Sequence, residues 1–132
     1  MSDTRRFVVW AFDIDPDDGS LRHRRVFVDH TASRERPDGA CLDAEGFIWN
    51  AMFGTGRLLR YAPDGRVDRA IELPVTNPTC PAFGGGNLDV LYVTTARKFL
   101  SAAQLAAEPM AGSVLALDVG VAGVPEARFA GP

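Results

Sequence analysis

The sequence predicts an all-β protein whose strands are grouped like the blades of a β-propeller. Runs of β-branched and aromatic residues, separated by turns rich in Gly, Pro and Asp, follow one another along the 132 residues. Equivalent positions recur about every 40 residues, since Trp49 and Tyr92 are 43 residues apart and Asp38 and Thr79 are 41 apart. Four strands in a repeat of roughly 40 residues are typical of propeller blades.

Residues 5–30 predict the last two strands of a first unit. The run "RRFVVWAFDID" (5–15) ends at the turn cluster "DPDDGS", and "LRHRRVFVDH" (21–30) follows it. Two β-rich runs joined by such a turn indicate a hairpin.

Residues 37–75 predict a complete blade of four strands. They are "GACLDA", "FIWNAMF", "RLLRYA" and "RVDRAIELP", and each is separated from the next by glycine or by Pro63-Asp64-Gly65.

Residues 78–132 predict a final blade in which the pattern begins again. Its strands are "TCPAFGG", "VLYVTTAR", "GSVLALDVG" and a weak fourth, "PEARFAG". Between the second and third lies "FLSAAQLAAEPMAG" (99–112), which predicts a short helix with Ser101 as N-cap and Pro109 as a stop. It is either a surface loop, which we favour, or a loop over the pocket end of the blades.

Composition and charge exclude several classes of protein. The net charge of −3 and the lack of a basic run give no reason to expect nucleic-acid binding. The longest apolar stretch near the start, residues 7–12, is far shorter than the roughly 18 residues of a membrane span, and "MSDTRR" lacks a signal region. Cys41 and Cys80 form no CxxC pair and have no histidine at metal-ligand spacing, which indicates buried, reduced thiols in a cytoplasmic protein.

Four stretches resemble the senescence-marker-protein/gluconolactonase/luciferin-regenerating-enzyme family. They are "PDGACLDAEGFIW", "RLLRYAPDGRV", "ELPVTNPTCPAFGGGNLDVLYVTTAR" and "GVAGVPEARFAG", in an order and spacing that chance seldom produces. The resemblance implies a six-bladed β-propeller about twice this length, of which this chain is the C-terminal half, or about two and a half blades. It also implies hydrolysis of a small lactone, such as a sugar lactone, with a divalent metal. Calcium or zinc is favoured, with magnesium or manganese as further candidates.

The resemblance assigns one metal ligand to this chain, Asp38. The family holds its metal with a Glu near the start of the full chain, an Asn near its middle, and the Asp of a Pro-Asp-Gly motif. Only the last has a counterpart here. Asp38 would hold the metal and take a proton from the attacking water, while the metal acidifies water and polarises the lactone carbonyl.

The two Pro-Asp-Gly copies differ in their place within a blade. Asp64 lies between a third and a fourth strand, where it predicts a hairpin turn. Asp38 comes at the first strand of a blade, which lines the channel of a propeller.

Other candidate residues are weaker. His23 and His30 are expected to be exposed at strand ends, and "FGGGN" (83–87) is a tight turn and not a phosphate loop. Arg97 could face the pocket, although a surface salt bridge is favoured. The aromatic side chains expected to pack between blades are Trp10, Trp49 and Tyr92.

Ten strands are fewer than a closed ring needs. We therefore expect missing strands before Met1, in a longer enzyme of which this chain is a fragment. Alternatively, a second copy or a separate N-terminal half completes the ring, or the chain is an inactive remnant. A non-catalytic module that binds a partner or small ligand is the competing function.

Overall fold

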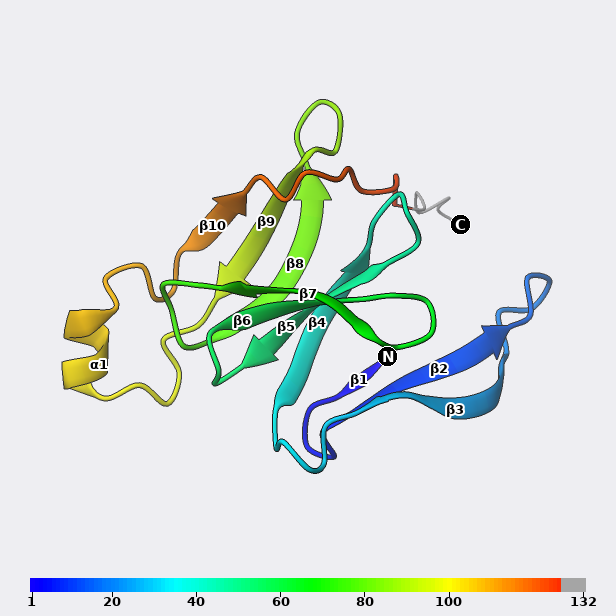
Figure 1. Ribbon diagram of the computed structural model, residues 1–132, viewed down its shortest axis with the longest axis horizontal. Coiled ribbons are helices and arrows are strands. Elements are labelled where there is room, and N and C mark those ends of the chain that lie inside the picture. Colours follow the sequence, from blue (N-terminus) through cyan, green and yellow to red (C-terminus); the bar gives the residue numbers. More distant parts are fainter. Residues whose placement is uncertain (127–132) are drawn as a thin grey trace.

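Three antiparallel sheets and one short helix make up the computed structural model, which describes residues 1–126 (Figure 1). The all-β fold class is confirmed, and the sheets are arranged as successive blades of a partial propeller. The elements are β1 (Ser2–Asp3), β2 (Val8–Ile14), β3 (Leu21–Asp29), β4 (Arg36–Leu42), β5 (Ile48–Phe53), β6 (Arg57–Tyr61), β7 (Val67–Glu72), β8 (Pro78–Gly84), β9 (Val90–Thr95), α1 (Ala102–Ala107) and β10 (Val114–Leu117).

The first sheet contains the expected hairpin, β2 and β3, and one strand that was not expected. The two residues of β1 pair with the free edge of β2, with Ser2 opposite Val9. Strand β1 escaped prediction because two polar residues, Ser2 and Asp3, carry no hydrophobic alternation.

The second sheet has the order β4-β5-β6-β7, so the four strands expected within residues 37–75 are present. Asp64 lies in the turn between β6 and β7, where its Oδ1 accepts a hydrogen bond from the backbone N–H of Arg66 at 3.0 Å. Gly65 follows with a φ of 85°, which favours glycine. The prediction that this copy is a turn is confirmed.

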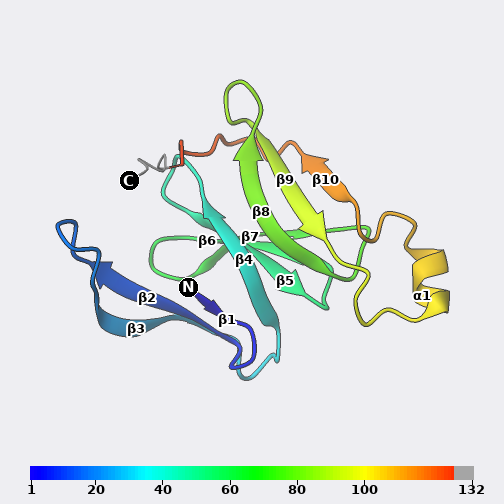
Figure 2. The ribbon, with the colours of Figure 1, turned by 180° about the vertical axis from the view of Figure 1, so that it is seen from behind.

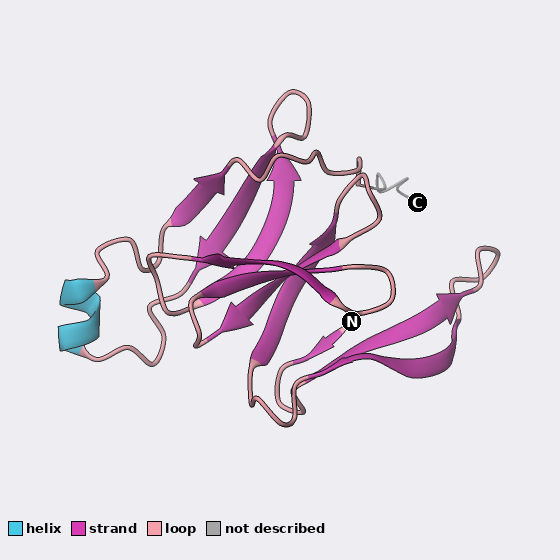
Figure 3. Ribbon diagram, viewed as in Figure 1, coloured by secondary structure: helices cyan, strands magenta, loops and turns pink. Residues whose placement is uncertain are grey.

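The third sheet has the order β10-β9-β8. Most of the expected fourth strand, residues 125–131, lies outside the described residues, and Pro125 and Glu126 are not in a strand. The predicted helix is confirmed: Ser101 and Gln104 form a capping box, and Pro109 comes directly after the C-cap residue, Glu108. Helix α1 buries no residue and projects from the sheets (Figure 3). No helix in residues 1–126 is long and apolar enough to cross a membrane.

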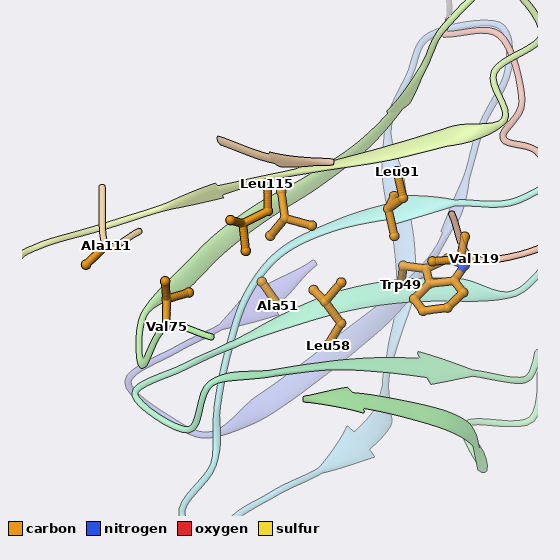
Figure 4. Packing of buried hydrophobic residues seen from close by; sticks show 9 residues of the cluster. Trp49, Ala51, Leu58, Val75, Leu91, Ala111, Leu115 and Val119 are labelled. Atoms are coloured by element: carbon orange, nitrogen blue, oxygen red, sulfur yellow. The ribbon is translucent and has the colours of Figure 1, made fainter. Parts of the chain in front are cut away.

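The main core lies between the second and third sheets (Figure 4). Trp49 and Leu58 of the second sheet pack with Leu91 and Leu115 of the third, and Trp49 is fully buried, as expected. Tyr92 is 40% exposed, so it does not pack between two sheets of residues 1–126 as expected. Alternate side chains of β9 point away from the second sheet, and no further sheet covers them in the described part of the chain.

A second cluster lies on the opposite side of the second sheet. Met52, Leu59 and Tyr61 are buried there against Phe27 and Val28 of the first hairpin. The first sheet therefore packs on one face of the second sheet and the third sheet on the other.

His30 is buried, contrary to expectation, with only 7% of its surface exposed. The segment after β3 turns inward, and the His30 Nε2 lies 2.7 Å from the Tyr61 hydroxyl oxygen. His30 Nδ1 is 3.5 Å from a carboxylate oxygen of Glu35, which also pairs with Arg57. Burial is the main cause that lowers the pKa of His30, so the neutral ring is favoured.

Asp43, which follows β4, and Arg60 of β6 form a buried ion pair within the second sheet. Asp43 is fully buried, and its Oδ2 accepts hydrogen bonds from Trp49 Nε1 at 2.9 Å and Arg60 Nε at 2.8 Å. Its Oδ1 accepts from the backbone N–H groups of Glu45 and Phe47, both at 3.0 Å. The Asp and Trp of "DAEGFIW" are thus structural.

Candidate active site around Asp38

Asp38 lies in a β-bulge near the start of β4. Pro37 pairs with Met52 and Ala40 pairs with Asn50, so β4 has one more residue than β5 across this interval. A bulge bends its strand and redirects the side chains within it. The Asp38 carboxylate is therefore carried by irregular backbone of the inner strand β4, and not by a regular ladder.

The side chain of Asn50 holds this bulge. Its Nδ2 donates to the backbone carbonyl oxygen of Asp38 at 2.9 Å and to that of Gly39 at 2.8 Å. Asn50 is fully buried, and its Oδ1 has no hydrogen-bond partner within residues 1–126. Asn50 was not among the predicted site residues, although a single polar residue inside the apolar run "FIWNAMF" was an available signal.

Gly39 brings β4 against β8, and the two inner strands lie side by side in the view from behind (Figure 2). A Cβ on Gly39 would lie 2.5 Å from the Sγ and 2.8 Å from the Cα of Cys80. Only glycine permits this approach, which places Cys80 next to the bulge that carries Asp38.

The two thiols favour the protonated form at neutral pH. Burial raises the pKa of the Cys41 thiol to about 12 and also raises that of Cys80, with a further increase from the nearby Asp38 carboxylate. Cys80 is exposed and Cys41 is half-buried, so the expectation of two buried thiols is wrong. A protonated thiol is a poor nucleophile and metal ligand.

Strand β8 repeats the bulge of β4 one blade later. Pro78 pairs with Thr95 and Cys80 with Thr94, which leaves Thr79 as the extra residue. Its hydroxyl oxygen is 2.7 Å from that of Thr94. Thr79 thus takes, in the third sheet, the place that Asp38 takes in the second.

Burial raises the pKa of Asp38, and a backbone hydrogen bond from Gly39 opposes this in part. Its side chain borders a cavity of about 900 Å³ between the first hairpin and the second sheet. Apolar side chains, including those of Val9, Phe12 and Ile48, form much of the lining. A partly desolvated carboxylate beside such a cavity can bind a cation or exchange a proton.

The residues present match a divalent metal in kind but not in number. Calcium takes about six to eight oxygen ligands, and carboxylates are common among them. Asp38 supplies a carboxylate of this kind, but no group of three His, Cys, Asp or Glu side chains that could hold a metal occurs within residues 1–126. A complete metal site would need ligands from outside the described residues.

Several connecting segments meet at the Asp38 end of the sheets. Strand β5 ends where β4 begins, because Phe53 pairs with Arg36. The connection from β9 to β10, which carries α1, is attached at the same end: Glu108 accepts a hydrogen bond from the backbone N–H of Thr76 at 2.7 Å, just before β8. This connection therefore borders the end where Asp38 lies.

Comparisons with known proteins show a family to which the chain is related. Residues 1–97 match the model of the SMP-30/gluconolactonase/LRE-like region. The chain is 43% identical over 131 residues to 6-deoxy-6-sulfogluconolactonase of Pseudomonas putida, covering 98% of this chain and 45% of that protein. It is 35% identical over 131 residues to regucalcin of Oryctolagus cuniculus, covering 98% and 44%. The chain thus spans less than half the length of these relatives.

Solved structures give the same relationship. A calcium-binding protein, regucalcin, from Agrobacterium tumefaciens superposes with a TM-score of 0.87 at 36% identity, covering 92% of this chain and 42% of that one. A luciferin-regenerating enzyme superposes with a TM-score of 0.80 at 28% identity, covering 92% and 41%.

Proposed function

Because the chain belongs to the SMP-30/gluconolactonase/LRE-like family, we propose that it forms part of a hydrolase of sugar lactones in which Asp38 is a catalytic residue and a metal ligand. The single observation that carries the proposal is the bulge at Asp38, a carboxylate on an inner strand beside a cavity. The 6-deoxy-6-sulfogluconolactonase relative supports the reaction class.

Asp38 has the chemistry for the proton transfers of lactone hydrolysis. Its carboxylate accepts a proton as a water oxygen attacks the carbonyl carbon, and returns it to the ring oxygen as the ring C–O bond breaks. A raised pKa suits a group that is protonated and deprotonated in turn. A divalent cation, when bound, supplies Lewis-acid polarisation and a lower pKa for water. Asp38 would hold it, and the calcium-binding regucalcin neighbour favours calcium over zinc, magnesium or manganese.

The proposed unit is the second half of a six-bladed ring. Residues 5–30 would end one blade, residues 37–75 would form the next, and residues 78–132 the last. The chain covers 45% of the sulfogluconolactonase relative, a share close to half of a ring. The remaining metal ligands would then come from residues outside this chain, and the proposed location is the cytoplasm.

Exposed apolar side chains on the first hairpin favour assembly with further polypeptide. Ile14 is 67% exposed, Leu21 58% and Val26 52%. A second copy of the chain, or a separate N-terminal half, would cover them. Light scattering that finds a stable, folded monomer would contradict the second-copy alternative.

The test compares the two Pro-Asp-Gly copies. Hydrolysis of glucono-δ-lactone by the completed protein, in which this chain is joined to the half that the relatives possess, is followed by acid release. Calcium, zinc, magnesium or manganese is added in turn, and a chelator serves as the metal-free control. We expect Asp38→Ala to abolish metal-dependent hydrolysis and Asp64→Ala, in the matching turn, to retain it. Equal rates for wild type and Asp38→Ala would remove Asp38 from the mechanism. A completed wild-type protein that shows no hydrolysis under any metal would favour the non-catalytic binding module.

A further inference from the structure

The turn that follows β9 contains a strained aromatic residue. The backbone N–H of Leu100 donates to the carbonyl oxygen of Arg97 at 3.3 Å, which closes a four-residue turn. Phe99, at the third position, has a φ of 68°, whereas Lys98 is not in this region. This is the pattern of a type II turn, which prefers glycine at the third position because a Cβ is strained there.

Phe99 does not bury its side chain in return for this strain. It is 77% exposed, and its packing partner is Phe53, whose ring lies edge-to-face with a centroid separation of 6.4 Å. A bulky residue at positive φ is strained, and such outliers gather at functional sites. The Phe99 ring is therefore available to a ligand and does not contribute to the core.

The turn is held rigidly. Asn77, only 3% exposed, donates from its Nδ2 to the backbone carbonyl oxygen of Lys98 at 2.8 Å. The backbone N–H of Ala96 donates to the carbonyl oxygen of Asn77 at 2.9 Å. A buried side chain thus fixes the backbone of an exposed turn, which is how a binding residue is held in place.

The turn lies at the Asp38 end of the sheets. Phe53, the partner of Phe99, is opposite Arg36 in the β4–β5 ladder, and Arg36 comes two residues before Asp38. The Phe53–Phe99 pair therefore joins the second and third sheets at the rim where the proposed lactone would enter.

The same turn carries two cationic side chains. Lys98 Nζ lies 4.9 Å from the centre of the Phe99 ring, and Arg97 is exposed. Within residues 1–126, neither Arg97 nor Lys98 takes part in a salt bridge, so the salt bridge favoured for Arg97 is not found. Two unneutralised cations beside an aromatic face can bind an anionic group attached to an apolar ring face.

We propose that Arg97, Lys98 and Phe99 form a specificity turn that selects lactones bearing an anionic substituent. The Phe99 ring contacts the C–H face of the sugar, and Lys98 and Arg97 bind its sulfonate or phosphate group. This inference rests on the proposed lactone hydrolysis and deepens it by naming the substrate class. Phosphate and sulfonate share the required charge, so the test includes both.

The test uses open-chain acids, the products of lactone hydrolysis, so that binding is measured without turnover. The ¹⁵N-labelled chain is titrated with 6-phosphogluconate, 6-deoxy-6-sulfogluconate, gluconate and inorganic phosphate. We expect the two anion-bearing sugars to shift the amide signals of residues 97–100 and to bind about fivefold or more tightly than gluconate. The tighter of the two identifies the natural anion.

Variants separate recognition from folding. Lys98→Gln with Arg97→Gln should reduce binding of the anionic sugars to the gluconate level, whereas Arg66→Gln, an exposed cation in the β6–β7 turn, should not. Phe99→Gly should weaken binding of all the sugars and leave Tm unchanged or raise it, because glycine relieves the turn. Equal affinity for gluconate and 6-phosphogluconate, or no binding of either, would overturn the proposal. So would equal affinity for inorganic phosphate and the anionic sugars.

Failure of this proposal and failure of lactone hydrolysis give different results. The titrations depend on the turn alone, whereas hydrolysis depends on Asp38. Hydrolysis of glucono-δ-lactone together with binding of the anionic sugars no tighter than that of gluconate would support the proposed reaction and contradict the specificity turn. A completed protein that binds the anionic sugars through Lys98 but does not hydrolyse the lactone keeps the specificity turn and loses the proposed reaction.

Discussion

Asn50 donates its side-chain amide to the backbone carbonyl oxygen of Asp38 at 2.9 Å, so a buried residue of β5 holds the bulge that presents the candidate carboxylate. The same amide reaches the carbonyl of Gly39. The backbone at Asp38 is thus fixed by a neighbouring strand and does not depend on the Asp38 side chain.

Replacement of Asn50 should loosen this bulge. Asn50→Ala removes the donor for two carbonyl groups, and we expect a loss of about 1–3 kcal/mol in the free energy of unfolding, measured with urea. Asn87→Ala, in the exposed turn before β9, is the matched control and should stay within about 0.5 kcal/mol of wild type. A loss no larger than that of the control would show that the bulge does not need Asn50.

A methyl group on Gly39 should push β4 and β8 apart. Gly39→Ala places its Cβ 2.6 Å from the Cβ of Cys80, so we expect destabilisation of about 1–3 kcal/mol by overpacking. A Cβ on Gly86 would meet no atom of residues 1–126 within 4 Å, and Gly86→Ala should be nearly neutral. Thermal unfolding of the two variants checks this. Equal Tm values would mean that β8 moves away from Gly39 without penalty.

The ionised carboxyl of Asp38 should destabilise the fold at neutral pH. Its pKa in the folded chain is raised above the ordinary 3.8 by burial, so the unfolded chain releases this proton first as the pH rises. The stability contributed by Asp38 therefore decreases from below pH 3.8 up to its folded pKa. Asp38→Asn should accordingly raise Tm at pH 7.

The gain from Asp38→Asn should shrink toward pH 3, where the wild-type carboxyl is protonated in both states. Added calcium should stabilise the wild type more than the variant if Asp38 is a ligand. Calorimetry of wild type and Asp38→Asn at pH 3 and pH 7 tests the sign of the difference in Tm. A Tm for Asp38→Asn below that of wild type at pH 7 would contradict it.

Loss of Asp43 should be far more damaging than loss of its neighbour Asp68. Asp43→Ala leaves the guanidinium of Arg60, only 4% exposed, without its fully buried partner, and we expect a cost of about 3–5 kcal/mol. Asp68 bonds the same Arg60 at 2.8 Å but is 30% exposed, so Asp68→Ala should cost at most about 1 kcal/mol. Urea unfolding of the two variants measures these losses. Similar losses for Asp43→Ala and Asp68→Ala would contradict the assignment of Asp43 as the main partner of Arg60.

The sequence predicted elements whose signals are local. Strand runs bounded by turns, the Asp64 turn and the Ser101 cap all depend on neighbours within a few residues. The prediction that His30 is exposed was wrong because its hydrogen-bond partner, Tyr61, is 31 residues away and in another sheet. Nothing near Tyr92 in the sequence indicates which face of β9 a further sheet would cover.

The candidate site was predicted only in part, for a similar reason. Asp38 was predicted from the Pro-Asp-Gly motif. The bulge that presents it depends on pairing with β5 and on Asn50, which the motif does not indicate. The positive φ of Phe99 has no sequence signal, because a turn with glycine at that position would be expected and phenylalanine is present. Tertiary contacts determine the backbone conformation at both Asp38 and Phe99.

The repeated bulge makes this chain a scaffold into which new ligands can be grafted. Asp38 and Thr79 occupy matching positions on adjacent inner strands, and Asn50 supports the first of them through backbone atoms alone. The Asp38 side chain can therefore be exchanged without redesign of the strand beneath it, whereas exchange of Thr79 also removes its hydroxyl contact with Thr94. A Thr79→Asp or Thr79→His variant would add a second donor one blade from the first, which makes the bulge pair a starting point for engineered metal selectivity.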